Sequence, residues 1–350
     1  MTEKQIKPPI TYFGNKARLA TWICSYFPEH LTYFEPFGGS ASVLLAKRPS
    51  KIEVYNDLNR ELVNLFQVLR SNDDLKKLQA ALDFTLYSRE DFNTAKVPTD
   101  TDPIEMARRT LIKYRQSHAG EAKQWSYCIT DSVSGMAGSV RKWKSGLERL
   151  RDIHKRLQRV QIECLDWAEV IKRYDTEKTL FYIDPPYVHE TRVNGTYSHE
   201  LDDSAHRKLI DSILNVQGMC IISGYEHPIY QALTEAGWTR EKKEVIASAS
   251  STRAKRIECL WISPGTRKRK NTGVLKSRSN QNDLFSSPVE MMRQGAYYAH
   301  ALKTKNMTTL ILAEINQFKR LGYKVSKTAI DESLNISREN ISRRYGHLFL

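Results

Sequence analysis

An aspartate, two prolines and a tyrosine follow an apolar segment in the middle of the chain. The motif is Asp184-Pro185-Pro186-Tyr187, and residues 179–183 before it predict a buried strand. A carboxylate and a backbone carbonyl can accept the protons of an exocyclic amino group and draw its nitrogen toward a more nucleophilic, tetrahedral form. The prolines restrict the backbone, and the tyrosine ring offers a stacking surface for a flipped base. The motif favours chemistry at an amino group, although a strand that simply ends in a proline-rich turn has the same composition.

A glycine turn forms a second candidate site, in residues 34–41 with the sequence FEPFGGSA. Glycines let the backbone approach a ligand closely, and the N-terminus of the following helix then faces that ligand. Asp57 closes the next expected strand, where a carboxylate can hold ribose hydroxyls. No Gly-Lys-Ser/Thr follows the glycines, so an adenosine ligand without phosphates fits better than a nucleotide. A third segment, 12–16 with the sequence YFGNK, predicts by itself only a turn.

Short apolar segments alternate with helical patterns through most of the chain, which predicts a three-layer α/β sheet. The first two strands and the helix between them should form a parallel βαβ unit. We expect strands at 32–35, 51–55, 160–164, 179–183, 219–222, 243–246 and 257–262, and helices at 40–47, 104–113, 143–157, 206–214 and 229–236.

The order of these motifs resembles the Dam-type adenine DNA methyltransferases, whose cofactor motif precedes both the target-recognition segment and the catalytic motif. The resemblance covers about residues 8–265, and 253–261 is similar to the family's closing arginine-containing segment. It implies transfer of a methyl group from S-adenosylmethionine to N6 of a flipped adenine in double-stranded DNA. Two features depart from the family. Ala41 stands where a second glycine is frequent, and the insertion does not match the GATC-reading segment, so GATC is not predicted.

The resemblance also implies residue roles. Asp184 and the Pro185 carbonyl would bind the target amino group within the catalytic motif completed by Pro186, with Tyr187 stacking on the base. Asp57 would hold the ribose and Asp166 the adenine of the cofactor. The complete cofactor site would comprise Tyr12, Gly14, Asn15, Lys16, Glu35, Pro36, Phe37, Gly38, Gly39, Ser40, Asp57, Asp166 and Asp184.

Charge is concentrated in two segments of a chain whose net charge is +14. Residues 105–160 hold 13 Lys and Arg against 5 Asp and Glu, and residues 265–350 hold 16 against 6. Basic segments interleaved with aromatic residues favour a nucleic-acid partner over a merely solvated surface. We expect DNA contacts from Lys113, Arg115, Arg141, Lys142, Lys144 and Arg253.

Composition divides the chain into four parts. Residues 1–70 and 160–265 form the predicted catalytic domain, and 71–159 form a mainly helical inserted target-recognition domain. A linker at 266–290 leads to a C-terminal helical domain at 291–350. In that last domain, 327–334 and 338–345 fit a DNA-binding helix-turn-helix, while a helical tail that packs on the core or joins two copies fits equally well.

Several classes of protein are disfavoured. There is no run of eighteen apolar residues for a membrane span and no secretory signal. Five scattered cysteines argue against disulfides or zinc and fit a reducing cytosol. We therefore expect a cytoplasmic protein, bacterial or phage-encoded, that uses S-adenosylmethionine without a metal. A homodimer and a cognate restriction enzyme remain open as partners.

The mechanism expected is direct in-line transfer to the base nitrogen, without a covalent enzyme intermediate. Three alternatives stay open. Cytosine-N4 methylation uses the same motif, although the motif order favours adenine. An RNA or protein-amide methyltransferase fits the basic segments less well than duplex DNA does. A non-catalytic DNA-binding regulator on the same scaffold is disfavoured by the intact carboxylates Glu35, Asp57 and Asp184.

Overall fold

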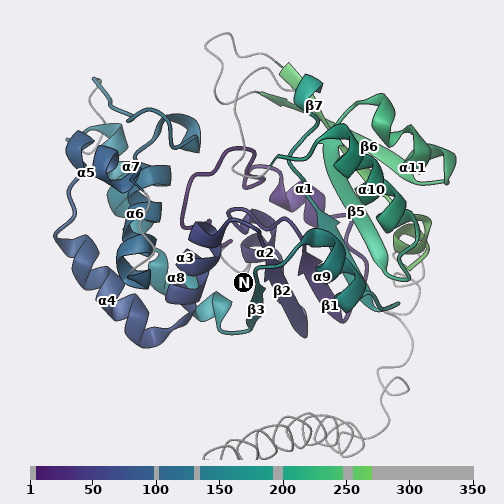
Figure 1. Cartoon of the computed structure of the whole chain (residues 1–350), viewed down its shortest axis with the longest axis horizontal. Helices are drawn as coiled ribbons and strands as arrows, with labels where there is room; N and C mark the ends of the chain where they lie inside the picture. The colour runs from purple at the N-terminus through teal and green to yellow at the C-terminus, as the bar shows by residue number, and fades with distance from the viewer. Residues whose placement is uncertain (1–4, 98–101, 130–134, 192–199, 247–254, 270–350) are drawn as a thin grey trace, which may run out of the picture. The chain divides into compact units, whose positions relative to one another are not determined.

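A seven-stranded mixed sheet forms the centre of the structure (Figure 1). Its strand order is β3-β2-β1-β4-β5-β7-β6. The first five strands in that order run parallel, and β7 is antiparallel to both β5 and β6. The strands are β1 (Thr32–Glu35), β2 (Ile52–Asn56), β3 (Val160–Glu163), β4 (Thr179–Ile183), β5 (Met219–Tyr225), β6 (Thr239–Ile246) and β7 (Lys255–Ile262).

The structure is a computed structural model that describes residues 5–97, 102–129, 135–191, 200–246 and 255–269. The predicted C-terminal helical domain with its helix-turn-helix, most of the predicted linker, and Arg253 lie outside these ranges. None of the helices within them is long and apolar enough to cross a membrane.

All seven predicted strands are present, with ends that differ by a few residues from the expected ones. The central strands β1 and β4 are buried along their whole length, as expected for parallel strands covered on both faces. Side chains alternate between two apolar cores: Tyr33 and Tyr182 belong to one, Phe34 and Phe181 to the other. This confirms the mixed α/β class and its layered arrangement.

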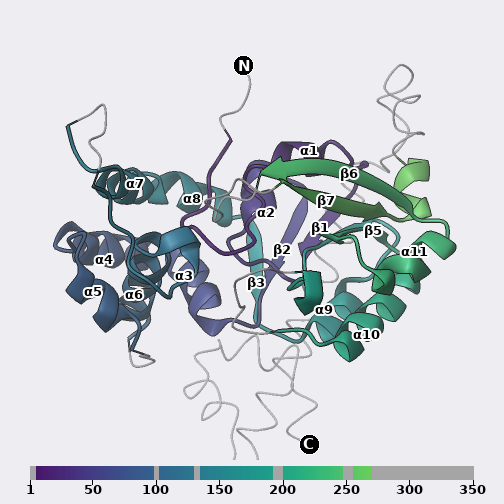
Figure 2. The same ribbon diagram turned by 90° about the horizontal axis from the view of Figure 1, so that it is seen from above.

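Helices cover both faces of the sheet (Figure 2). The core that contains Tyr33 also holds apolar residues of α1, α2 and α3, whereas the core that contains Phe34 holds those of α9, α10 and α11. Besides α3 (Arg60–Arg70), which precedes the predicted insertion, these helices are α1 (Ala20–Cys24), α2 (Ser42–Ala46), α9 (Trp167–Tyr174), α10 (Asp203–Leu214) and α11 (Gln231–Glu235), with short 3-10 turns η2 (His189–Thr191) and η3 (Pro228–Tyr230).

Within the described residues, α3 to α8 gather beside the sheet (Figure 1). Their apolar side chains continue the core that contains Tyr33 without a break. Asn59, Ser71, Ser88 and Asp102 cap the first four by accepting backbone N–H groups. The helices are α3 (Arg60–Arg70), α4 (Asn72–Asp83), α5 (Arg89–Ala95), α6 (Pro103–Arg115), α7 (Gly138–Leu147) and α8 (Leu150–Leu157), with a 3-10 turn η1 (His118–Gly120) after α6.

Two predicted helices need correction. The single helix expected at 143–157 is two helices, α7 and α8, separated at residues 148–149. Gly146 in the last turn of α7 lowers helix propensity, and the break lets Leu150 and Ile153 enter the core. The helix expected from residue 40 begins at Ser42, because Ala41 takes a left-handed backbone conformation with φ 55°.

Candidate active site

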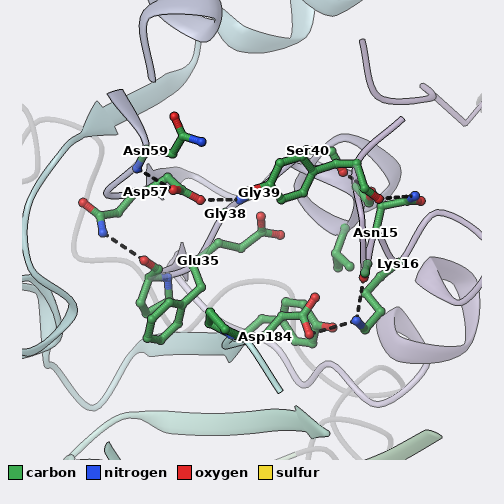
Figure 3. A pocket seen from close by; sticks show the side chains of 18 of the residues that line it. Asn15, Lys16, Glu35, Gly38, Gly39, Ser40, Asp57, Asn59 and Asp184 are labelled. Atoms are coloured by element: carbon green, nitrogen blue, oxygen red, sulfur yellow. Dashed lines mark hydrogen bonds and ion pairs between the residues drawn. The ribbon is translucent and has the colours of Figure 1, made fainter. Parts of the chain in front are cut away.

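A pocket that is partly open to solvent lies where β1, β2 and β4 end (Figure 3). Since these parallel strands are neighbours in the sheet, the segments that follow them meet at one edge. The N-terminal segment 12–16 forms another part of the wall. The pocket is lined by Tyr12, Gly14, Asn15, Lys16, Glu35, Pro36, Phe37, Gly38, Gly39, Ser40, Asp57 and Asp184, which are all the predicted cofactor-site residues except Asp166.

The glycine turn packs directly against the end of β2. The Gly38 N–H donates to the Asn56 carbonyl at 2.8 Å, and the Tyr55 hydroxyl donates to the Gly39 carbonyl at 2.8 Å. A Cβ on Gly38 would lie 2.2 Å from the Tyr55 ring, so the close approach requires glycine there. Gly39 has φ 50° and Ala41 φ 55°. Ala41, where the resemblance led us to expect a second glycine, therefore holds a left-handed conformation that glycine would adopt at lower cost.

Asp57 is held at the pocket wall by two backbone N–H groups. Its carboxylate accepts from Gly39 N and from Asn59 N, each at 2.8 Å (Figure 3). The neighbouring Asn56 side chain bonds to the Pro36 carbonyl at 2.9 Å and to both backbone groups of Leu165 at 3.0 Å. These bonds fix the ends of β1, β2 and β3 relative to one another.

Asp166 occupies a different position from the other predicted cofactor residues. It is exposed and caps α9 by accepting from Ala168 N at 2.8 Å. Its neighbour Trp167 lines the pocket, while Asp166 itself does not. The structure therefore leaves Asp166 outside the set of residues that line the pocket, next to one that does.

Glu35 is a buried carboxyl group within the pocket wall. It is 2% exposed, and it accepts a hydrogen bond from the Tyr33 hydroxyl at 2.7 Å. Burial raises the pKa of Glu35 to about 8, and hydrogen bonds from Tyr33 and the Leu44 backbone offset part of this. A cation bound nearby would favour the ionised form.

One carboxylate oxygen of Asp184 contacts two side chains. The Lys16 ammonium lies 2.9 Å from Oδ1 as an ion pair, and the Ser223 hydroxyl donates to Oδ1 at 2.8 Å. The Asp184 carboxylate also lines the pocket, where a substrate can reach it. Lys16 also donates to the Gly14 carbonyl at 2.7 Å. These contacts hold the N-terminal segment against the motif that follows β4.

Tyr187 is buried behind Asp184 and does not line the pocket. Its hydroxyl donates to Glu258 on β7, and the Lys16 ammonium lies 4.6 Å from the centre of its ring. Pro186 lines the pocket, whereas Pro185 is buried next to it. Neither Ser223 nor Glu258 was predicted from the sequence to have a role. An acidic residue within the apolar segment 257–262 was the available signal for Glu258.

The predicted DNA contacts divide into two groups. Arg141, Lys142 and Lys144 are exposed on α7 around the buried Trp143. Lys113 instead forms a salt bridge with Glu61 of α3.

Arg115 is also engaged within the protein. Its guanidinium donates to the Pro9 carbonyl at 2.9 Å and to the Lys142 carbonyl, and burial lowers its pKa to about 10. It therefore connects the N-terminal segment to α7, and α7 carries the exposed charges.

No group of three or more His, Cys, Asp or Glu side chains that could hold a metal ion occurs within the described ranges. The pocket offers carboxylates, backbone groups and aromatic rings instead. Carboxylates and aromatic rings can bind an organic cation.

The fold and the site together define the class of Rossmann-like methyltransferases: a parallel sheet completed by an antiparallel strand pair, with a glycine turn after β1 and carboxylates after β2 and β4. Within that class the chain belongs to the D12 class N6 adenine-specific DNA methyltransferases, whose family model matches residues 12–245. The protein is an enzyme that methylates the N6 amino group of adenine in DNA. Membership of this family favours adenine-N6 methylation over the alternative of cytosine-N4 methylation, and an enzyme over a non-catalytic regulator. It also implies that S-adenosylmethionine is the methyl donor.

Relatives agree with this membership. The type II methyltransferase M.MjaIII of Methanocaldococcus jannaschii is 23% identical over 206 residues, which are 52% of this chain and 70% of that protein. A DNA adenine methylase of Haemophilus influenzae is 24% identical over 225 residues, 60% of this chain and 75% of that protein. The modification methylase StsI of Streptococcus sanguinis matches over a shorter stretch, 30% identical over 79 residues, 22% of this chain and 12% of that protein.

Proposed function

We propose that the pocket at the ends of β1, β2 and β4 binds S-adenosylmethionine and the flipped target adenine side by side, with Asp184 as the catalytic carboxylate. The observation that carries this proposal is that Asp184 shares one pocket with the glycine turn and with Asp57. A methyl donor held by the turn would lie next to a base held by Asp184. Transfer can then proceed in line, without an intermediate attached to the protein.

The pocket residues fit the donor. Asp57, held by two N–H groups, is placed to accept from ribose hydroxyls. The buried Glu35 carboxyl suits the cationic methionine part, and the Trp167 ring next to Asp166 suits the adenine ring. Bound S-adenosylmethionine supplies a methyl group on a positively charged sulfur. Tyr12, Asn15 and Lys16 would close the site from the N-terminal segment.

Asp184 and the Pro185 carbonyl would activate the amino nitrogen. Each accepts a hydrogen bond from the amino group, which reduces delocalisation of the nitrogen lone pair into the ring. Ser223 holds the Asp184 carboxylate in place through the bond to Oδ1. The prolines limit backbone motion at the position where the base must be held within a fraction of an ångström.

Double-stranded DNA would be read by the helical insertion, residues 71–159. The exposed Arg141, Lys142 and Lys144 on α7 fit phosphate contacts, which position a protein on DNA without specifying its sequence. A cytoplasmic enzyme of bacterial or phage origin, acting alone or with a cognate restriction enzyme, fits this reading. A homodimer and a DNA-binding C-terminal domain belong to the same proposal.

Asp184→Ala tests the assignment. The variant should lose methyl transfer to unmethylated genomic DNA, measured with labelled S-adenosylmethionine, because the Pro185 carbonyl alone then accepts from the amino group and no carboxylate polarises it. It should keep its affinity for the donor, since Asp57 and the glycine turn are intact. Asp57→Ala is the matched control. It should weaken binding of the donor, and its methyl transfer should recover when the donor concentration is raised. Measurable turnover by Asp184→Ala would overturn the assignment.

A further inference from the structure

Four side chains form a buried cluster next to the pocket: Lys16, Asp184, Tyr187 and Glu258. The Lys16 ammonium lies 2.9 Å from Asp184 Oδ1 and 3.8 Å from Glu258 Oε1. Glu258 also accepts a hydrogen bond from the Tyr187 hydroxyl. Lys16 is 5% exposed, Tyr187 4% and Glu258 3%. Of the four, only Asp184 and Lys16 line the pocket, so Glu258 contacts the reacting groups through other side chains.

The Lys16 ammonium occupies a position beside Asp184 that the amino group of the target base would need. It lies 2.9 Å from an oxygen of the carboxylate that must accept from the target adenine, and 4.6 Å from the centre of the buried Tyr187 ring. A base whose amino group binds Asp184 in the expected way competes with this ammonium. The ammonium must therefore change partner before the base can be seated.

Glu258 is the second acceptor within reach. It is an acidic side chain on a strand whose neighbours Cys259 and Leu260 are fully buried, an expensive place for a carboxylate unless it is paired. Burial raises the pKa of Glu258, and the Lys16 charge and the Tyr187 hydroxyl offset part of that rise. The Glu258 carboxylate is thus held in place by Lys16 and Tyr187.

We propose that Glu258 is a positioning residue that takes the Lys16 ammonium from Asp184 as the target base enters, so that Asp184 becomes free to accept from the amino group. The inference rests on the proposed function, because it assumes that the base is bound at Asp184. A small displacement of a flexible lysine side chain is sufficient, and no covalent step is involved. In the absence of DNA the same lysine neutralises the Asp184 carboxylate.

Glu258→Gln tests the proposal. Glutamine keeps an oxygen that accepts from Tyr187 and removes the negative charge that attracts Lys16. We expect kcat/KM for unmethylated DNA at saturating donor to fall roughly ten- to a hundredfold, the range for removal of a charge-assisted hydrogen bond. Donor affinity should stay unchanged. Glu226→Gln, which removes an exposed carboxylate paired with Arg240 and Lys242, is the matched control and should behave as wild type.

The Lys16→Met background separates positioning from a structural role. If Glu258 acts through Lys16, adding Glu258→Gln to Lys16→Met should cause no further loss, whereas independent effects would multiply. Equal loss in both backgrounds, or wild-type activity of Glu258→Gln, would overturn the proposal. If Glu258→Gln does not fold, Glu258→Asp, which keeps the charge but shortens its reach, takes its place in the same cycle. Failure of the wild-type enzyme to methylate DNA would instead count against the proposed function.

Discussion

At the scale of single residues, Glu35 makes the protonation state of the pocket depend on pH. Burial raises its pKa to about 8, so near neutral pH much of the donor-free protein carries a proton on this carboxyl. The folded state then binds more protons than the unfolded state between pH 4.5 and about 8. Stability contributed by this group therefore falls as pH rises through that window, by up to about 1.4 kcal/mol per pH unit.

We expect donor binding at pH 7 to release a proton from Glu35. A cationic ligand beside the carboxyl favours its ionised form, which lowers its pKa. Calorimetric titration of the protein with S-adenosylmethionine in two buffers of different ionisation enthalpy measures the number of protons released. Glu35→Gln should abolish the release, and an equal release by this variant would assign the proton to another group.

At the scale of elements, the turn between β1 and α2 depends on the ring at the end of β2. Tyr55 fills the space that a Cβ on Gly38 would need, and its hydroxyl holds the Gly39 carbonyl. The glycine pattern in residues 34–41 was readable from the sequence. The need for glycine beside the Tyr55 ring could not be predicted from the sequence, because Tyr55 on β2 and the turn after β1 are brought together only when the two strands pair.

Gly38→Ala should therefore damage both stability and donor binding. The new Cβ forces the turn away from the Tyr55 ring, for which we expect a loss of about 1–3 kcal/mol in the free energy of unfolding. Thermal unfolding and donor titration measure the two effects. Gly265→Ala is the matched control, since a Cβ there meets nothing within 4 Å. A Gly38→Ala protein with wild-type donor affinity would show that the turn tolerates the shift.

At the scale of the whole molecule, the core and the basic tail are separate units divided after Leu275. The helical turn at 264–269 belongs to the core, because Thr266 is buried and its hydroxyl accepts from Cys220 N on β5 at 3.0 Å. Residues 276–350 carry 12 Lys and Arg against 6 Asp and Glu. A test of the tail must therefore cut after Thr266.

Truncation after Leu275 should weaken DNA binding and flatten its dependence on salt. Each DNA phosphate that the tail neutralises contributes about 0.9 to the slope of log affinity against log salt, and the truncated protein should lack that contribution. Binding of duplex DNA across a range of salt concentrations measures the slope for both proteins. An unchanged slope would mean that the tail does not bind DNA phosphates and would favour a packing or dimer role.

The sequence by itself determined the strands, the two carboxylate motifs and the family, because apolar periodicity and short motifs are local properties of the chain. In the insertion the sequence indicated α6 and one helix where α7 and α8 lie, but not α4 or α5. The break at 148–149 depended on what α7 and α8 pack against. Tertiary structure alone decided which of the predicted DNA-contacting Lys and Arg side chains are exposed to a partner. It turned Lys113 and Arg115 inward and left Arg141, Lys142 and Lys144 exposed. It also brought Lys16, near the start of the chain, and Glu258, on β7, into one cluster with Asp184, because a buried charge is stable only beside a partner of opposite charge.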